Sequence, residues 1–240
     1  MKIFKLLLDI IYPYQPKCLY CGQDLKLPEL KGLCNNCISQ IEFIDNYCPL
    51  CGEKNNNNFC IYCQNKNIYY DKVRAVGYYT GILRDLILNF KYNGEIELAD
   101  SLGELLYLYY QNYFHKLSID FLLPIPLHYN RKKIRGFNQA YLLAQKLYEY
   151  SSIPLLNDYL VRVRNNPPLF QFSYKKRKEL LKNIFAIKQN YSISGSTVLI
   201  IDDIFTTGST INQASFLLKE KQKVKNVYAL TLGISRKKYK

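Results

Sequence analysis

The chain has 240 residues, of which 48% are hydrophobic and 22% charged, a composition typical of a globular protein with one or two domains. Its 33 Lys and Arg against 19 Asp and Glu give a net charge of +14, which favours polyanionic partners such as nucleic acid or an anionic membrane, although an AT-rich genome also produces Lys-rich chains. No hydrophobic segment reaches membrane-spanning length, so we expect no transmembrane segment.

The N-terminus carries an apolar run over residues 3–12 that contains Lys5 and Asp9 and ends before Pro13. The run is too short to span a membrane, and no small-residue cleavage site follows it. We therefore expect an amphipathic helix over residues 1–17 that packs on the rest of the protein. We identify no export signal.

All eight cysteines lie in a predicted Cys-rich domain over residues 18–70, in four pairs with two residues between the members of each pair. The pairs are Cys18/Cys21, Cys34/Cys37, Cys48/Cys51 and Cys60/Cys63. This spacing lets both thiolates of one turn face the same metal ion, and two pairs complete a tetrahedral shell. We predict one or two structural zinc sites. A sequential grouping of the pairs is the simplest, and a cross-braced grouping stays open.

Disulfides, an iron–sulfur cluster and redox-active pairs are the alternatives to zinc. Disulfides require an oxidising compartment, whereas four thiolates also suit an iron–sulfur cluster. The spacing favours zinc. Because the segment has few other core residues, the metal is expected to supply much of its folding energy.

A second domain with an α/β pattern is predicted over residues 71–240. It opens with a strand over residues 73–79 and a helix over residues 82–90. A longer helix over residues 96–117 carries leucines and tyrosines at helical spacing, and such an aromatic stripe is typical of a core face.

The next predicted strand covers residues 121–128 and ends in prolines. A basic stretch precedes Gly136 and a helix over residues 141–148. Its cations are Arg131, Lys132, Lys133 and Arg135. Because ligands of α/β proteins bind beyond the carboxyl ends of strands, we predict a mobile loop that closes over a pyrophosphate or follows a nucleic-acid backbone. His128, at the exit of the strand, is a candidate to line the site.

The segment over residues 162–185 places three alternating aromatic residues before four consecutive cations at 175–178. Aromatic rings beside cations can stack on bases while the cations contact phosphates. An ordinary edge strand facing the core explains the alternation equally well.

The most informative stretch follows a buried, β-branched strand predicted over residues 198–201. Asp202 and Asp203 come next, then a loop of small hydroxylated residues over 206–210, and then a helical pattern. A loop that enters a helix N-terminus presents free N–H groups and a positive dipole end to a phosphate. The two carboxylates suit sugar hydroxyls or Mg²⁺. Phosphate, sugar diol and Mg²⁺ together describe a phosphoribosyl ligand.

The chain ends with a predicted strand over residues 224–234, which closes a right-handed βαβ unit, and a basic tail over residues 236–240.

The stretch over residues 200–210 resembles the phosphoribosyl-pyrophosphate (PRPP) signature of type I phosphoribosyltransferases. The order of all the blocks is similar to the ComF family of bacterial competence-associated proteins. The matching blocks are the four cysteine pairs and residues 90–94, 124–128, 135–140, 166–168 and 201–210. The resemblance covers nearly the whole chain. It implies a mostly parallel sheet flanked by helices, with a small Cys₄ zinc-binding domain before it.

The resemblance also implies roles for individual residues. The phosphoribosyl group would be bound by Asp202, Asp203, Thr206, Thr207, Gly208, Ser209 and Thr210. A basic segment for pyrophosphate or DNA would comprise Arg131, Lys132, Lys133, Arg135, Gly136, Phe137, Asn138 and Gln139. Further candidates are Lys91, His128 and Arg177. Three positions after Arg177 the family pattern has Asn where this chain has Leu180, which weakens the transfer of roles in that segment.

The family implies a cytoplasmic protein that handles incoming single-stranded DNA during natural transformation, with a competence helicase or other DNA-uptake proteins as partners. A working phosphoribosyltransferase that uses Mg²⁺-bound PRPP is the alternative. A third reading is a housekeeping role without DNA binding. The sequence leaves open whether PRPP is turned over and what the acceptor is.

Overall fold

The computed structural model describes residues 16–25, 30–45, 47–53, 55, 58–64, 67–164, 184–188 and 191–235. Three predicted features lie outside the described residues. They are the N-terminal helix apart from residues 16 and 17, the segment over 165–183 with Arg177, and the basic tail over 236–240.

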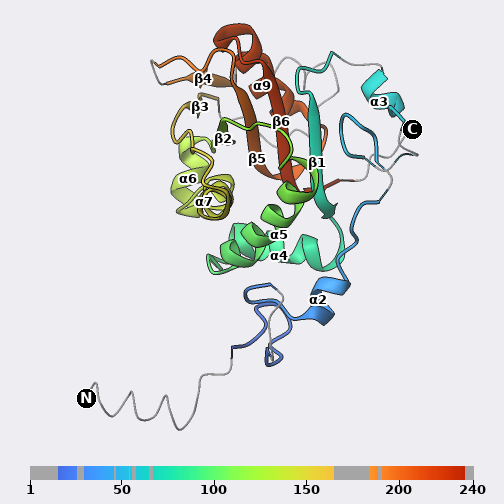
Figure 1. Ribbon diagram of the computed structural model, residues 1–240. Helices are drawn as coiled ribbons and strands as arrows, with labels where there is room; N and C mark the ends of the chain where they lie inside the picture. Colours follow the sequence, from blue (N-terminus) through green and yellow to red (C-terminus); the bar gives the residue numbers. More distant parts are fainter. Residues whose placement is uncertain are drawn as a thin grey trace.

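A parallel sheet with the strand order β1–β6–β5–β2 forms the centre of the described structure (Figure 1). Its strands are β1 (Lys72–Tyr78), β2 (Phe121–Pro124), β5 (Thr197–Phe205) and β6 (Asn226–Ile234). Two short strands, β3 (Leu160–Arg162) and β4 (Phe185–Ile187), form a separate antiparallel pair. The helices are α2 (Asn35–Ser39), α3 (Ile61–Gln64), α4 (Gly81–Tyr92), α5 (Leu98–Tyr113), α6 (Tyr129–Arg135), α7 (Gln139–Ser151) and α9 (Ser209–Gln222). The predicted α/β architecture is confirmed.

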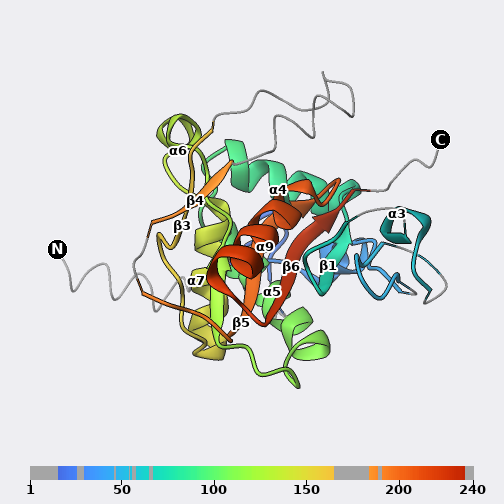
Figure 2. The ribbon, with the colours of Figure 1, turned by 90° about the horizontal axis from the view of Figure 1, so that it is seen from above.

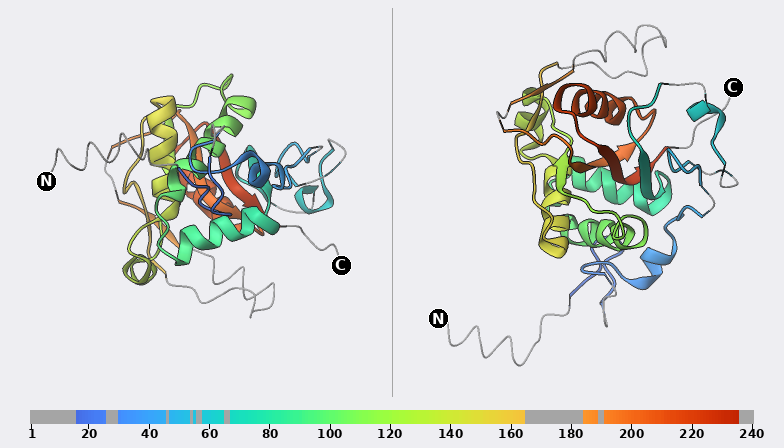
Figure 3. Two further views of the ribbon diagram at one scale, coloured as in Figure 1. Left: turned by 90° about the horizontal axis from the view of Figure 1, so that it is seen from below. Right: turned by 45° about the horizontal axis from the view of Figure 1, so that its top comes forward.

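The buried side chains of β5 point alternately to the two faces of the sheet, so each face has its own hydrophobic core. Val198 and Ile200 belong to one buried cluster, and Leu199 and Ile201 belong to the other. Helix α9 covers the first face, and α4, α5 and α7 cover the second (Figures 2 and 3). A parallel strand that is apolar on both sides needs such a double cover, and β5 therefore lies in the interior of the sheet.

The Cys-rich segment closes the free edge of β1. The Val73 N–H donates to the Leu50 carbonyl at 2.7 Å, and the Tyr78 N–H donates to the Glu42 carbonyl at 2.9 Å. An open edge of this kind would be a template for pairing with another chain. At the opposite edge, β2 pairs in the same way with the segment around Leu155.

The link between the Cys-rich segment and β1, residues 67–71, forms hydrogen bonds and an ion pair with α9 and β6 near the C-terminus. The side-chain oxygen of Asn212 on α9 accepts the Tyr69 N–H at 2.7 Å. Asp71 accepts the Val227 N–H at 2.7 Å and forms an ion pair with Lys219 at 2.7 Å. These contacts fix the link against α9, which follows the predicted phosphate loop, and against β6.

Strand β5 is longer than predicted. Its ladder with β6 continues past Ile201, through the pair Asp202 and Thr231, to Phe205 and Ile234. Asp202 and Asp203 therefore lie within the strand and not after it, which corrects the sequence prediction. The ladder needs only backbone groups, so two polar side chains near its end do not stop it.

The predicted mobile loop over residues 131–135 is wrong, because these residues form helix α6. His128 caps the helix, with its Nδ1 accepting the Asn130 N–H at 3.3 Å, and Gly136 ends it at a φ of 84°. Lys and Arg are good helix formers, so a cap at each end is sufficient for this short helix.

Other predicted bounds shift by a few residues. The helix over 96–117 is α5 (Leu98–Tyr113), the strand over 121–128 ends at Pro124, and the strand over 224–234 begins at Asn226. The pair β3–β4 was not predicted.

Gly77 lies where the Cys-rich segment crosses β1, and a Cβ there would sit 2.8 Å from the Glu42 carbonyl oxygen. We expect Gly77→Ala to lower the free energy of unfolding by about 1–3 kcal/mol through overpacking, measured by urea denaturation. Gly77→Val should lower it further. Equal stability of all three proteins would show that the two segments do not approach each other this closely.

Candidate functional site

Asp202 and Asp203 lie near the carboxyl end of β5, where the parallel strands converge on the loop before α9. Successive strand residues face opposite sides of a sheet. Asp203 faces α4, where its Oδ2 is 2.9 Å from the Nζ of Lys91. The two side chains are only 16% and 12% exposed, so this ion pair is partly shielded from water. The pair brings together two residues that are 112 positions apart in the sequence.

Asp202 lies among groups on other elements. Burial and the neighbouring Asp203 raise the pKa of Asp202 to about 8, against the opposing effects of its hydrogen bond with the Asp203 N–H, of Lys91 and of Arg162. On β3, burial and the nearby Arg131 guanidinium lower the pKa of Arg162, and Asp202 opposes this shift. Asp202, Arg131 and Arg162 therefore form one electrostatic group at the end of the sheet.

The loop after β5 has the form expected for an anion site. Gly208 precedes α9 at a φ of 70°, and a Cβ there would lie 2.6 Å from the Phe205 ring, so both conformation and packing require glycine. The Thr207 and Ser209 hydroxyls are 2.9 Å apart. A small polar hollow opens here, lined by Asp202, Ile204, Phe205, Thr206, Gly208, Thr210 and Ile211. The free N–H groups of the first turn of α9 suit a phosphate.

The turn between α6 and α7 fixes the basic helix in position. Phe137 packs against Phe90 on α4, with ring centroids 5.6 Å apart. Asn138 accepts the Ala140 N–H at 3.1 Å and donates to the Ile125 carbonyl at 3.0 Å, which ties α7 to the end of β2.

Gln139 is completely buried, and its Oε1 accepts a hydrogen bond from Arg135 at 2.6 Å. Phe137, Asn138 and Gln139, which sequence reasoning grouped with the phosphate ligands, thus make packing and capping contacts.

The remaining candidates are not brought together. Lys132 and Lys133 are exposed on α6. His128 uses its Nδ1 to cap that helix. Arg162 was missed as a site residue, because a lone arginine at the end of a three-residue strand carries no motif. Its only sequence signal is a cation after a short apolar run.

The eight cysteines form two clusters in the sequential grouping. One contains Cys18, Cys21, Cys34 and Cys37, the other contains Cys48, Cys51, Cys60 and Cys63, and within each cluster the sulfur atoms all lie within 4.8 Å of one another. None of the eight forms a disulfide. The closest sulfur pairs are 3.6–3.8 Å apart, much longer than a disulfide bond of about 2.05 Å.

These distances fit one metal ion in each cluster. A tetrahedral shell with zinc–sulfur bonds of about 2.3 Å has sulfur–sulfur edges of about 3.8 Å. The four thiolates of an iron–sulfur cluster are divided among two or more iron atoms, so all four do not converge on one centre. The N–H groups of Cys34 and Cys60 also point at the sulfurs of Cys18 and Cys48, at 3.5 and 3.4 Å. Such N–H groups stabilise a metal-bound thiolate.

Burial raises the pKa of Cys18, but N–H groups that include those of Cys21 and Cys34 outweigh it and lower this pKa to about 6. Burial and the crowded sulfurs raise the pKa of Cys37. Without a cation, only some of these thiols can lose their protons. A bound cation stabilises all four thiolates and displaces their protons.

Comparison with known proteins places both parts of the chain. A double zinc ribbon domain model matches residues 7–65. Competence protein F of Haemophilus influenzae is 34% identical over 211 residues, which are 85% of this chain and 91% of the relative. The chain belongs to the competence protein F (ComF) family. The family predicted from the sequence is confirmed.

Other relatives agree with this ComF assignment. Competence protein ComFC of Bacillus subtilis is 31% identical over 83% of both chains. The DNA utilization protein YhgH of Escherichia coli K12 is 29% identical over 84% of this chain and 89% of the relative.

Solved structures similar to this ComF chain include two purine-type phosphoribosyltransferases. The adenine phosphoribosyltransferase of Saccharomyces cerevisiae has 17% identity and a TM-score of 0.37, with 59% of this chain and 72% of that chain covered. The purine phosphoribosyltransferase of Pyrococcus horikoshii has 13% identity and a TM-score of 0.34, with 58% and 90% covered. Among the described residues, no helix is both long and apolar enough to cross a membrane.

We expect the purified ComF-family chain to hold two zinc ions, measured by elemental analysis against protein concentration. Cys21→Ser and Cys60→Ser should each lose one zinc ion and keep the other, because their clusters are separate. A single zinc ion, or the visible absorbance of an iron–sulfur cluster, would contradict the assignment.

The raised pKa of Asp202 gives a second prediction. Between the ordinary aspartate pKa of about 4 and its folded value of about 8, the folded state binds this proton more tightly than the unfolded state. Rising pH in that window therefore destabilises the wild type through Asp202. In magnesium-free buffer, Asp202→Asn should gain stability relative to wild type as the pH rises from 5 to 8. The control is Asp100→Asn on α5, where the half-exposed carboxylate pairs with Lys146. A pH-independent difference for Asp202→Asn would refute the shift.

Proposed function

We propose that this chain is a DNA-handling protein that binds a phosphoribosyl group at the β5–α9 loop and single-stranded DNA over the basic surface of α6. The observation that carries the proposal is the Asp202–Asp203 pair, held between Lys91 and the cations of α6 and β3, directly before an anion-binding helix start. The names of the relatives, which refer to competence and DNA utilization, support the cellular role.

The chemistry of the site supports a phosphoribosyl ligand. The N–H groups at the start of α9 and the hydroxyls of Thr207 and Ser209 suit a 5′-phosphate. The carboxylates of Asp202 and Asp203 suit the two ribose hydroxyls. Arg131 and Arg162 provide positive charge for a pyrophosphate or for the next phosphate of a strand.

Magnesium fits this donor set, because carboxylate and phosphate oxygens are its usual ligands. When bound, it would neutralise the negative charge of a pyrophosphate. Zinc has a separate, structural role in the Cys-rich module.

A working phosphoribosyltransferase is the second candidate, favoured by the completeness of the loop and the acidic pair. In that reaction the anomeric carbon–oxygen bond breaks, pyrophosphate leaves, and an acceptor nitrogen bonds to the same carbon. Arg131 and Arg162 would stabilise the charge that develops on the leaving group.

Under the DNA-handling proposal, the protein works in the cytoplasm and hands single strands to other uptake factors, such as a competence helicase. The support for these partners is the naming of the relatives alone.

The double variant Asp202→Asn/Asp203→Asn separates the two ligands. We expect it to lose binding of Mg²⁺-bound PRPP by about 100-fold or more, since two charged contacts are removed, while single-stranded DNA binding stays within about twofold. Calorimetry measures the first ligand and fluorescence anisotropy the second. The control, Asp100→Asn, should bind both ligands normally.

Pyrophosphate release from Mg²⁺-bound PRPP, alone and with pooled nucleobases or oligonucleotides, decides between the two functions. Release that depends on one acceptor and disappears in the double variant would establish a transferase. Full PRPP binding by the double variant would overturn the site assignment.

A further inference from the structure

The C-terminal end of α4 presents an aromatic ring that the core does not use. Tyr92, the last residue of the helix, is 70% exposed. The Arg135 guanidinium lies over its ring, with Cζ 4.9 Å from the centroid. We propose that Tyr92, backed by Arg135, is a stacking platform for a base of single-stranded DNA at the rim of the phosphoribosyl site. This inference rests on the proposed function and names the part of the surface that reads the strand.

The platform is fixed before any ligand binds. Arg135 is held by its hydrogen bond to the buried Gln139 at 2.6 Å. Phe90, two residues before Tyr92, is fully buried and packs against Phe137 on the turn after α6. Packing of Phe90 thus holds the end of α4, and the hydrogen bond to Gln139 holds the arginine. A ring that is already positioned loses little conformational entropy when a base stacks on it.

The α6 side of the platform suits a polyanion, whereas Glu95 and Glu97 follow Tyr92 in the chain. The chain has no acidic residue between Asp120 and Glu149, a stretch that contains the whole of α6 and the turn after it. Lys132 and Lys133 are exposed on this helix. Tyr129 at its start is a second exposed ring, 72% accessible. Cations that follow a backbone, interleaved with rings that stack on bases, are the usual means of binding a single strand without sequence preference.

The position of Tyr92 connects the two proposed ligands. The preceding residue, Lys91, points inward to Asp203 at 2.9 Å, whereas Tyr92 points outward. Consecutive helical residues differ by about 100° in direction, so the two side chains lie on adjacent faces of one helix end. Tyr92 is therefore the residue next to the one that pairs with Asp203, on an adjacent, solvent-facing side of the helix end.

A stacking ring at Tyr92 favours single strands over duplex DNA. In a duplex the bases are stacked on each other and their faces are covered, so a protein ring reaches them only after unstacking. A protein that uses Tyr92 in this way binds an unpaired strand more tightly than the same strand in a duplex.

A binding cycle tests the contribution of the ring to base stacking. Wild type and Tyr92→Leu are titrated, by fluorescence anisotropy at fixed salt, with a labelled oligonucleotide of about 20 thymidines and with an abasic strand of equal length. Tyr92→Leu should weaken binding of the thymidine strand about tenfold and leave binding of the abasic strand unchanged. Tyr92→Phe, which keeps the ring, should bind like wild type.

Two further variants separate stacking from charge and from general surface effects. Tyr148→Leu, at a ring on α7 that is 47% exposed, is the matched control and should bind both strands normally. Lys132→Gln/Lys133→Gln should weaken both strands alike and reduce the slope of log affinity against log salt by about 0.7 for each lysine. Zinc content and the thermal midpoint, compared for every variant, confirm that each protein is folded.

The outcomes distinguish this inference from the function on which it rests. If wild type binds single strands but Tyr92→Leu binds the thymidine strand equally well, or loses affinity equally for both strands, the stacking platform is refuted and DNA binding stands. If folded wild type does not bind single strands, the proposed DNA-handling function fails, and the platform fails with it.

Discussion

The backbone hydrogen bonds between the Cys-rich segment and strand β1 are the interaction on which the rest of the structure depends. Val73 and Tyr78 donate to carbonyls of that segment and close an edge that would otherwise be open to other chains. The two cysteine clusters extend the contact into both cores. Cys18 and Cys37 belong to the core under α4 and α5, and Cys51 belongs to the core under α9.

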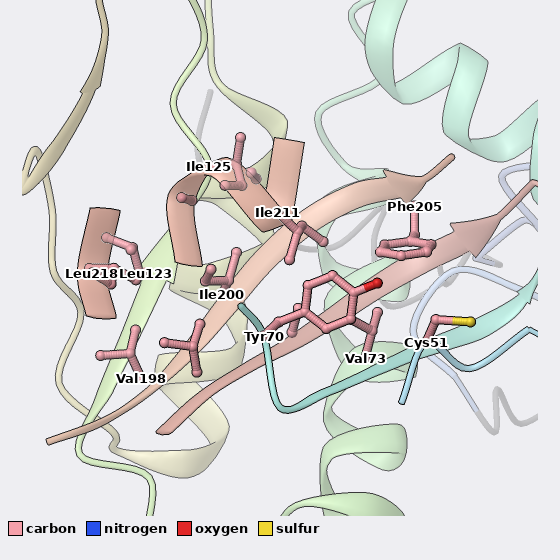
Figure 4. Packing of buried hydrophobic residues seen from close by; sticks show 14 of the residues in the cluster. Cys51, Tyr70, Val73, Leu123, Ile125, Val198, Ile200, Phe205, Ile211 and Leu218 are labelled. Carbon is pink, nitrogen blue, oxygen red and sulfur yellow. The ribbon is translucent and has the colours of Figure 1, made fainter. Parts of the chain in front are cut away.

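The region where the Cys-rich segment meets β1 is also packed against the loop of the candidate site. Figure 4 shows Tyr70, the last residue but one before β1, beside Phe205, Ile211 and Val73, with Cys51 on the adjoining segment. The Tyr70 and Phe205 rings meet edge to face with centroids 6.0 Å apart. Phe205 is also the residue whose ring forbids a side chain at position 208. The Cys-rich module, the link to β1 and the loop before α9 therefore share one packed region, so loss of zinc would affect the loop.

Asp202 and Asp203 have different partners, because successive residues of a strand point to opposite faces of the sheet. Asp203 pairs with Lys91, whereas Asp202 interacts electrostatically with Arg162, and burial and the neighbouring Asp203 raise its pKa to about 8. A carboxyl group in that state is sensitive to an incoming cation or sugar hydroxyl. The basic helix α6 is held in place by Asn138 and Gln139, so the positive charge opposite the acidic pair is fixed by the fold.

Features that depend on local spacing could be predicted from the sequence. Cysteine pairs with two residues between their members specify metal-binding turns, the apolar run over 198–201 specifies a buried strand, and Gly208 before a helical pattern specifies the anion-binding loop. Tertiary structure alone decided which distant groups meet these elements. The pairing of Lys91 with Asp203, the approach of Arg162 to Asp202 and the stacking of Arg135 on Tyr92 join residues from different elements. Single side chains at large sequence separations leave no periodic signal, because their positions follow from how helices pack on the sheet. The helical state of residues 131–135 was missed for a related reason, since it depends on caps at His128 and Gly136 and not on an apolar pattern.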